Sequence, residues 1–372
     1  MRRTWRDRLG AAGDQRPDLY CLHQEPRPYE VDCSLGVNPL GMSPRVAERL
    51  REPLSGLDLA PYPRGEGTLA EALSSAWGGL FRPEQVLLGC GSMGVLLSLL
   101  RVLGRPGASL LGLSPQFPDF PFQARFSGME VRSLPLPFPE FALEPERLLR
   151  EVVPGDSAVY LDRPHNPTGQ VLPLGDVARL AERCGDCGAS LLVDEAYGEF
   201  LPEAESALNL DHPAVTVVRS FSKGWGLAGL RVGYGVVRDP QLREVLGWST
   251  PPFEVSVLGT ELACEALKDR DFPARSRAAV AFLKREVLKV LGGVPGLRTA
   301  ATDPEVPLLL GVAEDPGEDL YETFLRRGIR TESGRAYPGL GARAVRLRVP
   351  REGDLARFRE LWEEPDPSPS PE

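Results

Sequence analysis

The chain has 372 residues, of which 42% are hydrophobic and 26% are charged, and its formal net charge is −9. The net negative charge argues against the basic surface that is typical of a nucleic-acid-binding protein. The sequence also has no apolar run long enough to predict a membrane span. We therefore expect a cytoplasmic globular protein with one large and one smaller domain, which binds neither nucleic acid nor a membrane.

The first eight residues include four arginines, Arg2, Arg3, Arg6 and Arg8. No apolar segment accompanies them and acidic residues follow. We therefore interpret the cluster as a solvated or frayed start of the chain, with a targeting segment as the alternative. In either interpretation it adds nothing to a candidate site.

Between residues 86 and 238, short apolar runs alternate with helical patterns. This alternation is typical of an α/β protein with a largely parallel sheet. The run at 232–238 follows so soon after the run at 215–219 that we expect an antiparallel strand there. The expected strands cover residues 86–89, 109–113, 158–161, 190–194, 215–219 and 232–238, with helices at 95–103 and 173–184.

Two cysteines, Cys184 and Cys187, stand at the spacing found in redox and zinc sites. The sequence has neither a second such pair nor a histidine pair beside them, so we expect no metal site. The preceding residues are amphipathic, and we interpret Gly185 and Gly188 as residues that end a helix. Six cysteines in a chain of this length also predict no disulfide framework.

A second pattern begins after about residue 265 and predicts a smaller α+β domain. We divide the chain into an N-terminal segment (1–45) that belongs to this smaller domain, a large domain (46–268) and a C-terminal smaller domain (269–362). The acidic, Pro-rich end at 363–372 predicts disorder. Within the second pattern, helices are expected at 275–291, 320–327 and 354–362, and strands at 306–312 and 344–349.

Polar side chains follow two of the expected strands. Asp194 begins the run DEAY at the end of one strand, and Asn166 lies in the run RPHNPTG after another. Ligands of open α/β sheets bind at the carboxyl ends of strands. A carboxylate there favours a protonated pyridine nitrogen, and an amide can bond a ring oxygen. The structural alternatives are a helix N-cap for Asp194 and an ordinary Asn-Pro turn.

Lys223 lies in the run SFSKGWGLAGLR, residues 220–231, directly after the strand at 215–219. Apolar and Gly-rich surroundings would desolvate its amine and make it nucleophilic. Ser220 and Ser222 offer hydroxyl groups, and Arg231 offers a planar fork suited to a phosphate. A lysine among glycines is also common in exposed loops, which is the alternative.

The run GCGSMG, residues 89–94, lies between an expected strand and an expected helix. Glycines there leave backbone N–H groups free to bind an anion at the start of the helix. The run lacks the Gly-Lys-Ser/Thr of a P-loop, and the sequence has no convincing dinucleotide-binding fingerprint, which disfavours a nicotinamide-dependent dehydrogenase.

The motifs occur in a consistent order: the Gly-rich turn, NPTG, DEAY, SFSKGWGLAGLR and a late arginine in AVRLRV, residues 344–349. Together they resemble the fold-type I enzymes that depend on pyridoxal 5'-phosphate (PLP), in particular the class I/II aminotransferases. The resemblance is greatest to the branch of histidinol-phosphate aminotransferase and threonine-phosphate decarboxylase. It implies a large domain with a mixed, mostly parallel central sheet and a smaller α+β domain.

The resemblance also implies roles for individual residues. Lys223 would carry PLP covalently and move a proton at the substrate. Asp194 would pair with the pyridine nitrogen, while Asn166 and Tyr197 would bond the ring hydroxyl. Lys223, Asp194 and Tyr197 are thus the expected catalytic residues. Further cofactor contacts fall on Gly91, Ser92, Met93, Phe117 (for which core packing is the alternative), Ser220, Ser222 and Arg231.

Other implied roles concern the substrate and a second subunit. Tyr62 matches a tyrosine that reaches the cofactor phosphate of the neighbouring subunit, which implies a homodimer. Arg346 would grip the substrate carboxylate, with Arg348 on the same strand face as the alternative, and Asn38 and Asn166 would also contact the substrate. His165 stands where the family usually has Asn or Pro, and we interpret it as a supporting or exposed residue rather than as a base.

We expect transamination between an amino acid or amino-alcohol phosphate and a 2-oxo acid. Decarboxylation of threonine phosphate is the alternative, because the runs NPLGM (38–42) and AYPGLGAR (336–343) resemble that decarboxylase at least as much. A binding protein without chemistry is the remaining alternative, and the intact set of Lys223, Asp194 and Arg231 argues against it.

Overall fold

The structure is a computed structural model that describes residues 27–52, 57–63 and 66–364. The N-terminal arginine cluster and most of the predicted disordered tail lie outside these residues. Glu363, which was expected to begin that tail, is instead the last residue of helix α13.

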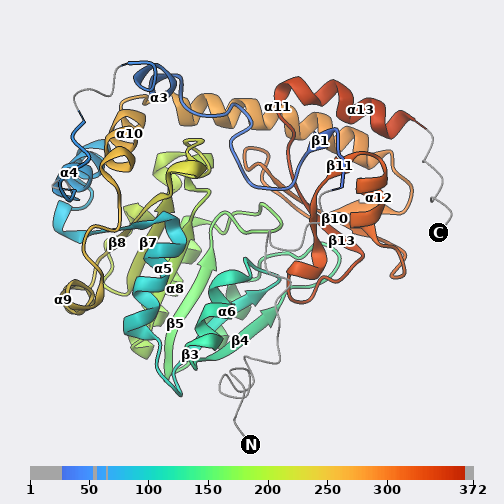
Figure 1. The fold of residues 1–372 in the computed structure, drawn as a ribbon. Coiled ribbons are helices and arrows are strands. Elements are labelled where there is room, and N and C mark those ends of the chain that lie inside the picture. The colour runs from blue at the N-terminus through green and yellow to red at the C-terminus, as the bar shows by residue number, and fades with distance from the viewer. Residues whose placement is uncertain (1–26, 53–56, 64–65, 365–372) are drawn as a thin grey trace, which may run out of the picture.

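A seven-stranded sheet forms the centre of the larger part of the molecule (Figure 1). Its strands lie in the order β2, β8, β7, β6, β5, β3, β4, and within this sheet only β8 runs antiparallel to its neighbours. The mostly parallel sheet and the antiparallel strand were both predicted correctly. The strands are β2 (Val86–Cys90), β3 (Ser109–Ser114), β4 (Glu130–Pro135), β5 (Asp156–Asp162), β6 (Ser190–Glu195), β7 (Val215–Ser220) and β8 (Val232–Val237).

The central strands read as continuous apolar runs because helices cover both faces of the sheet. Tyr160, Leu192 and Val218 point to one face, where they pack with apolar residues of α5, α6 and α9. Leu161 and Val193 point to the other face, where α8 packs. The helices of this part are α3 (Pro44–Arg49), α4 (Glu66–Ala76), α5 (Gly91–Leu103), α6 (Asp119–Phe126), α7 (Pro145–Glu151), α8 (Leu174–Cys187), α9 (Pro240–Ser249) and α10 (Val257–Leu267).

Two helix boundaries correct the predictions. Helix α5 begins at Gly91 rather than at residue 95, so the Gly-rich run ends strand β2 with Gly89 and Cys90 and then forms the first turn of the helix. Helix α8 continues through Gly185 and ends at Cys187, followed by Gly188 with a φ of 72°. Only the second of the two glycines therefore ends the helix, since its left-handed conformation suits a residue without Cβ.

A four-stranded antiparallel sheet, in the order β12, β13, β10, β9, forms the second part of the molecule. The N-terminal segment joins this part, because β1 pairs in parallel with β11 (Figure 1). The domain boundaries at residues 45, 268 and 362 remain a prediction. The elements here are β1 (Val31–Asp32), α11 (Phe272–Gly292), β9 (Leu297–Thr299), β10 (Leu308–Ala313), α12 (Leu320–Arg326), β11 (Ile329–Arg330), β12 (Glu332–Ser333), β13 (Ala344–Arg348) and α13 (Leu355–Glu363).

A buried lysine on α11 forms hydrogen bonds with the segment at residues 302–308, which precedes and begins β10. The Lys284 ammonium donates to the Thr302 hydroxyl and to the carbonyl oxygens of Asp303, Val306 and Leu308, at 2.5–2.9 Å. Burial lowers the pKa of Lys284 to about 7. Without this side chain, three buried carbonyl groups would lose a donor, so Lys284 is a structural residue of the smaller sheet.

We predict that Lys284→Met lowers the free energy of unfolding by about 2 kcal/mol or more, because it leaves buried acceptors unsatisfied. Lys289→Met, on the same helix, is the matched control. Lys289 is exposed and pairs with Glu286 on the surface of the same helix, so its replacement should leave stability nearly unchanged. Chemical denaturation measures both variants, and equal stabilities would contradict the structural role of Lys284.

Candidate active site

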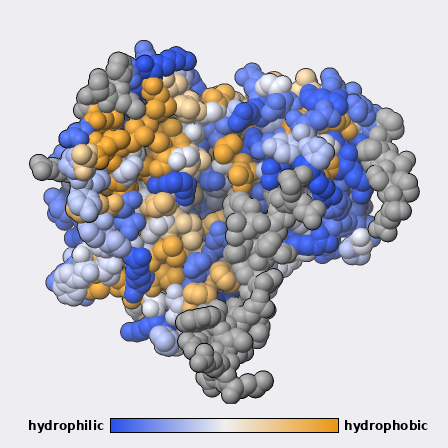
Figure 2. Space-filling view, in the orientation of Figure 1, coloured by the Kyte–Doolittle hydropathy of each residue, from blue (hydrophilic) through white to orange (hydrophobic). Residues whose placement is uncertain are grey.

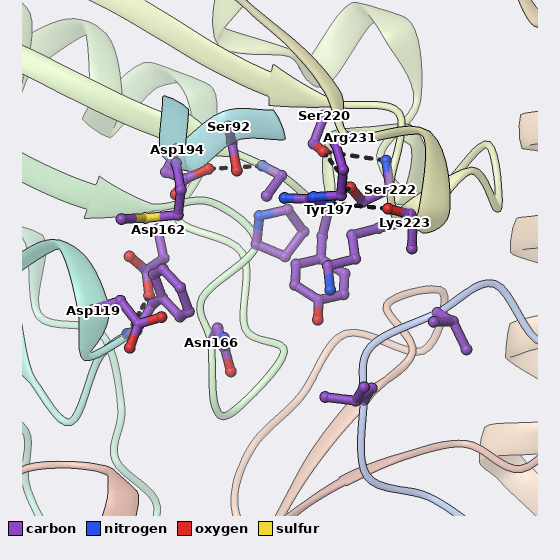
Figure 3. A pocket seen from close by; sticks show the side chains of 17 residues that line it. Ser92, Asp119, Asp162, Asn166, Asp194, Tyr197, Ser220, Ser222, Lys223 and Arg231 are labelled. Atoms are coloured by element: carbon purple, nitrogen blue, oxygen red, sulfur yellow. Dashed lines mark hydrogen bonds between the residues drawn. The ribbon is translucent and has the colours of Figure 1, made fainter. Parts of the chain in front are cut away.

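A cavity of about 340 Å³ lies at the carboxyl ends of β5, β6 and β7 (Figure 3). It brings together residues from every sequence motif except the late arginine run, and from the N-terminal segment, which lies far from them in the chain. The lining residues are Leu35, Val37, Ser92, Met93, Phe117, Asp119, Asp162, Pro164, Asn166, Asp194, Ala196, Tyr197, Ser220, Ser222, Lys223, Ala228 and Arg231.

Asp194 places a buried carboxylate in this cavity. Its Oδ1 accepts from the backbone N–H of Ala196 at 2.9 Å, and its Oδ2 accepts from the Tyr160 hydroxyl at 2.9 Å. Burial raises the pKa of Asp194 to about 6 despite these bonds. A positively charged partner, such as a protonated ring nitrogen, would therefore find a favourable position here.

Asp162 ends β5 in register with Asp194 on β6. Its Oδ2 accepts from the backbone N–H of Phe117 at 2.8 Å, which holds that residue at the cavity. Burial, followed by the nearby charge of Asp194, raises the pKa of Asp162 well above its usual range. We therefore expect Asp162 to hold a proton and Asp194 to carry the negative charge of the pair.

Lys223 and Tyr197 approach each other from the other side of the cavity. The Lys223 ammonium lies 5.6 Å from the centre of the Tyr197 ring. The buried Tyr197 hydroxyl has no hydrogen-bond partner among the described residues. A Cβ atom at Gly36 would lie 1.7 Å from that hydroxyl, so the N-terminal segment passes directly over Tyr197 and only glycine fits there.

A cup of polar groups lies beside Lys223. The Ser220 and Ser222 hydroxyls are 2.9 Å apart, and the Arg231 guanidinium donates to Ser222 at 3.2 Å. Arg231 itself adopts a φ of 56°, which is uncommon for a residue with a side chain. A Cβ at Gly91 would meet this guanidinium at 2.7 Å, so Gly91 allows the arginine to approach the start of α5.

These observations fit a phosphorylated pyridine cofactor. Asp194 suits a protonated ring nitrogen, the unpartnered Tyr197 hydroxyl suits a ring oxygen, and the serine–arginine cup at the start of α5 suits a phosphate. Asn166 also faces the cavity, and its Oδ1 accepts from the buried Tyr337 hydroxyl at 3.3 Å. The sequence placed each of these residues near the others, and the structure brings them into one cavity.

Beneath the cavity, a buried ion network holds the same three strand ends together. Glu195 bonds Arg163 at 3.2 Å and Arg219 at 3.1 Å, and Arg219 also bonds Glu199 at 3.1 Å. Glu195 further accepts from the Ser206 hydroxyl at 2.6 Å. Each of these charges is paired and hydrogen-bonded, as buried charges require.

Asn38 does not line the cavity, and its contact with the substrate remains a prediction. Its amide donates to the Gly224 carbonyl at 2.6 Å and to the Ser276 hydroxyl at 2.9 Å, and its oxygen accepts from Leu40. Since both ends of the amide are engaged, Asn38 connects the N-terminal segment to the loop of Lys223 and to α11.

Arg346 and Arg348 also lie outside the cavity lining. Both side chains are buried, and both donate to backbone carbonyls of the N-terminal segment: Arg346 to Ser34 at 2.6 Å and Arg348 to Leu35 at 2.7 Å. Leu35 itself lines the cavity. The two arginines therefore hold the segment that covers Tyr197, and direct contact with a substrate remains a prediction for Arg346.

Tyr62 stands apart from the cavity of its own chain. Its side chain is 75% exposed and stacks on Phe253, with 5.0 Å between ring centres. This position is compatible with a role in a neighbouring subunit, which the single chain does not test.

His165 is fully buried, which excludes the exposed interpretation. Its Nε2 faces the Pro115 carbonyl at 2.9 Å, and its Nδ1 faces the Thr168 hydroxyl at 2.8 Å. A carbonyl only accepts, so Nε2 carries the proton and Nδ1 accepts, which is the neutral tautomer. Burial lowers the pKa of His165 to about 4. The residue therefore supports the NPTG turn and is no base.

Cys184 and Cys187 belong to helix packing. Cys184 is buried in the core beneath the sheet, and burial raises its pKa to about 12. Cys187, at the end of α8, packs against the same core. Within the ranges that the structure describes, no cluster of three or more histidine, cysteine or acidic side chains is arranged to hold a metal ion.

Several lining residues were not predicted from the sequence. Asp162 follows the rule that identified Asp194, because it also ends a buried parallel strand. Asp119 begins α6, a short helix that the sequence patterns missed. Leu35 and Val37 reach the cavity only because the N-terminal segment crosses over it, and no local pattern predicts that crossing.

A family model described as "Aminotransferase class I and II" matches residues 31–313. The chain belongs to this family. The histidinol-phosphate aminotransferase of Oleidesulfovibrio alaskensis is 31% identical over 366 residues, which cover 95% of this chain and 91% of that protein. Family membership makes the chain a PLP-dependent aminotransferase, and it excludes the dehydrogenase interpretation.

Solved structures confirm the predicted fold class. The histidinol-phosphate aminotransferase from Clostridium acetobutylicum superposes with a TM-score of 0.80 at 17% identity, covering 90% of this chain and 98% of its own. The enzyme from Sinorhizobium meliloti, solved in complex with pyridoxal-5'-phosphate, gives 0.77 at 23% identity, covering 91% and 92%. At these identities the likeness of the aminotransferase structures establishes the fold.

We predict that His165 makes folding stability depend on pH. Its folded pKa, about 4, lies below the ordinary value of 6.5, so between these values the unfolded chain binds a proton that the folded chain does not. Stability from this residue is therefore complete above pH 6.5 and is lost as the pH falls toward 4, by up to ~3 kcal/mol. The measurement compares the unfolding free energies of the wild type and His165→Gln from pH 7 to pH 4. Their difference should shrink on acidification, and a constant difference would refute the assignment.

Proposed function

We propose that this aminotransferase moves an amino group between an amino acid or amino-alcohol phosphate, of the histidinol-phosphate kind, and a 2-oxo acid. The observation that carries the proposal is the opposition of a buried carboxylate, Asp194, and an amine, Lys223, across one cavity. The bound cofactor supplies an electron sink that makes a proton at the substrate's α-carbon acidic.

Lys223 would hold the cofactor and then act as the base that moves this proton. Its neighbour Tyr197 would donate its unpartnered hydroxyl to the ring oxygen, together with the amide of Asn166. Asp194 would keep the ring nitrogen protonated, since its negative charge favours the charged form of that nitrogen.

The phosphate of the cofactor would bind in the cup of Ser220, Ser222 and Arg231, against the first turn of α5. Ser92 and Met93 of that turn line the cavity, and their backbone N–H groups lie at the positive end of the helix. Phe117, held by Asp162, would pack on the ring. Arg346 would bind the acidic group of the substrate after a shift of the covering segment.

We predict that Lys223→Ala lowers the rate of amino transfer by ~10³-fold or more, because it removes the proton-moving amine. Lys268→Ala is the matched control, since Lys268 is exposed and forms an ion pair with Glu265 on the surface. The assay follows amino transfer from histidinol phosphate to 2-oxoglutarate. Equal loss in both variants, or none in either, would contradict the role of Lys223.

The same assay separates the two reactions that the sequence left open. An aminotransferase consumes a 2-oxo acid in proportion to the donor and releases no carbon dioxide. A threonine-phosphate decarboxylase releases carbon dioxide and needs no acceptor. Release of carbon dioxide from threonine phosphate, without amino transfer from any donor, would replace the proposed reaction by the alternative.

A homodimer is the second part of the proposal. Apolar surface gathers on the side of the molecule that carries α3, α4 and α10 (Figure 2). Large apolar side chains that lie exposed in the single chain include Leu59, Tyr62, Trp248 and Phe253. Exposed apolar surface of this kind is typical of a subunit interface, and the exposed Tyr62 would then reach the partner's cofactor phosphate.

Hybrid dimers test the shared site. Mixing the inactive variants Tyr62→Ala and Lys223→Ala should restore about a quarter of the wild-type activity, because half of the randomly formed dimers would contain one intact site. Mixing Arg231→Ala with Lys223→Ala is the control and should restore nothing, since both residues line the cavity of the same chain. Failure of the first mixture, in a sample that sediments as a dimer, would disprove the role of Tyr62.

A cytoplasmic location remains part of the proposal. Within the described ranges, no helix combines the length and the apolar character that crossing a bilayer requires.

A further inference from the structure

The cavity carries one carboxylate that no proposed cofactor contact uses. Asp119 is the first residue of α6 and lines the cavity. Among the described residues, no side chain forms a hydrogen bond or ion pair with its carboxylate. In Figure 3, Asp119 lies on the opposite side of the view from Lys223, with Asn166 between them. Asp119 therefore faces the part of the cavity that is left for a substrate.

The other charges of the lining are already engaged. Asp194 accepts from Tyr160, and Asp162 accepts from the backbone of Phe117. The cations of the lining are Lys223 and Arg231, which hold the cofactor and its phosphate in the proposed function. The substrate side chain would thus meet Asp119 without a protein cation beside it.

Two arginines that precede the late motif, Arg335 and Arg343, do not supply such a cation. Arg335 pairs with Asp319 at 2.7 Å, and Arg343 stacks over the Phe138 ring at 4.2 Å. Neither lines the cavity. Among the described residues that line the cavity, a phosphate at the Asp119 end would therefore meet a carboxylate and no cation.

A second carboxylate, Glu332, acts on Asp119, and a buried arginine faces that carboxylate from the neighbouring strand. Burial, followed by the charge of Glu332 on β12, raises the pKa of Asp119 to about 6. Glu332 lies opposite Arg346 in the antiparallel pair, with 4.0 Å between the charged groups. A partly buried carboxylate beside another carboxylate gains most from a ligand that brings a positive charge or an N–H donor.

We propose that Asp119 is a specificity-determining residue, which selects amino donors whose side chain ends in a cationic or N–H-donating group such as imidazole. It disfavours donors whose side chain ends in a phosphate or carboxylate. The inference rests on the proposed aminotransferase function, and it adds which kind of side chain the amino donor carries. Stabilisation of α6 by a negative charge in its first turn is the alternative role, and it predicts no effect on ligand choice.

Equilibrium binding tests the proposal without turnover. The ligands are 3-(imidazol-4-yl)propionate and 3-phenylpropionate, which carry the same propionate arm on a planar aromatic ring and lack the reactive amino group. The wild-type PLP-loaded protein should bind the imidazole ligand about tenfold more tightly or better, and Asp119→Leu should abolish the preference. Asp176→Leu is the matched control, because Asp176 also lies in the first turn of a helix, α8, but not at the cavity. Calorimetry measures each affinity.

A wild type without this preference, or an Asp119→Leu protein that keeps it, would overturn the proposal. If Asp119→Leu does not fold, Asp119→Asn takes its place, because it removes the charge and keeps the shape, and the preference should then fall at least ~threefold. An unchanged preference in Asp119→Asn would overturn the proposal in the same way.

Turnover separates this inference from the proposed function. Histidinol phosphate and phenylalaninol phosphate share the phosphate arm and differ only in the ring. Preferential conversion of histidinol phosphate, lost in Asp119→Leu with the rate on phenylalaninol phosphate retained, supports both proposals. Equal conversion of the two donors would contradict the role of Asp119 and would leave the proposed aminotransferase function standing. If neither donor is converted while the binding preference persists, the proposed reaction fails and the role of Asp119 stands.

Discussion

Two carboxylates, Asp162 and Asp194, lie in register at the carboxyl ends of adjacent parallel strands, and both are buried. Two buried carboxyl groups so close together do not both ionise without a compensating positive charge. We therefore expect Asp162 to hold a proton and Asp194 to carry the negative charge that a cation can pair with. The arrangement of the cavity follows from this constraint. Asp162 accepts from the backbone N–H of Phe117, Asp194 would face the ring nitrogen of a bound cofactor, and the ion network of Glu195 joins the strand ends.

The cavity also depends on the N-terminal segment, which two arginines of the smaller sheet hold in place. Arg346 and Arg348 hold the carbonyls of Ser34 and Leu35, and this grip lays Gly36 over the Tyr197 hydroxyl. Direct contact between Arg346 and a substrate remains a prediction. It would require the covering segment to move, because the Arg346 guanidinium donates to the Ser34 carbonyl.

Much of the site was predictable because its residues follow strands. Lys223, Asp194 and Asn166 lie where β7, β6 and β5 end, and the periodicity of a buried parallel strand is a local property of the sequence. The positions of Asn38 and Asp119 were not predictable in this way. Asn38 is engaged by Gly224 and Ser276, which are distant in sequence, and Asp119 begins a helix of eight residues with weak amphipathic character. Contacts between distant segments decide both.

The proposed function requires that the cofactor is attached covalently to one lysine, Lys223. Reduction of the PLP-loaded protein with borohydride, followed by proteolysis and mass spectrometry, locates that attachment directly. The structure predicts that the phosphopyridoxyl mass is found on the peptide that contains Lys223, and that the protein loses its visible absorbance on reduction. Attachment to another lysine, or a protein that takes up no cofactor while it remains folded, would contradict the assignment of this cavity.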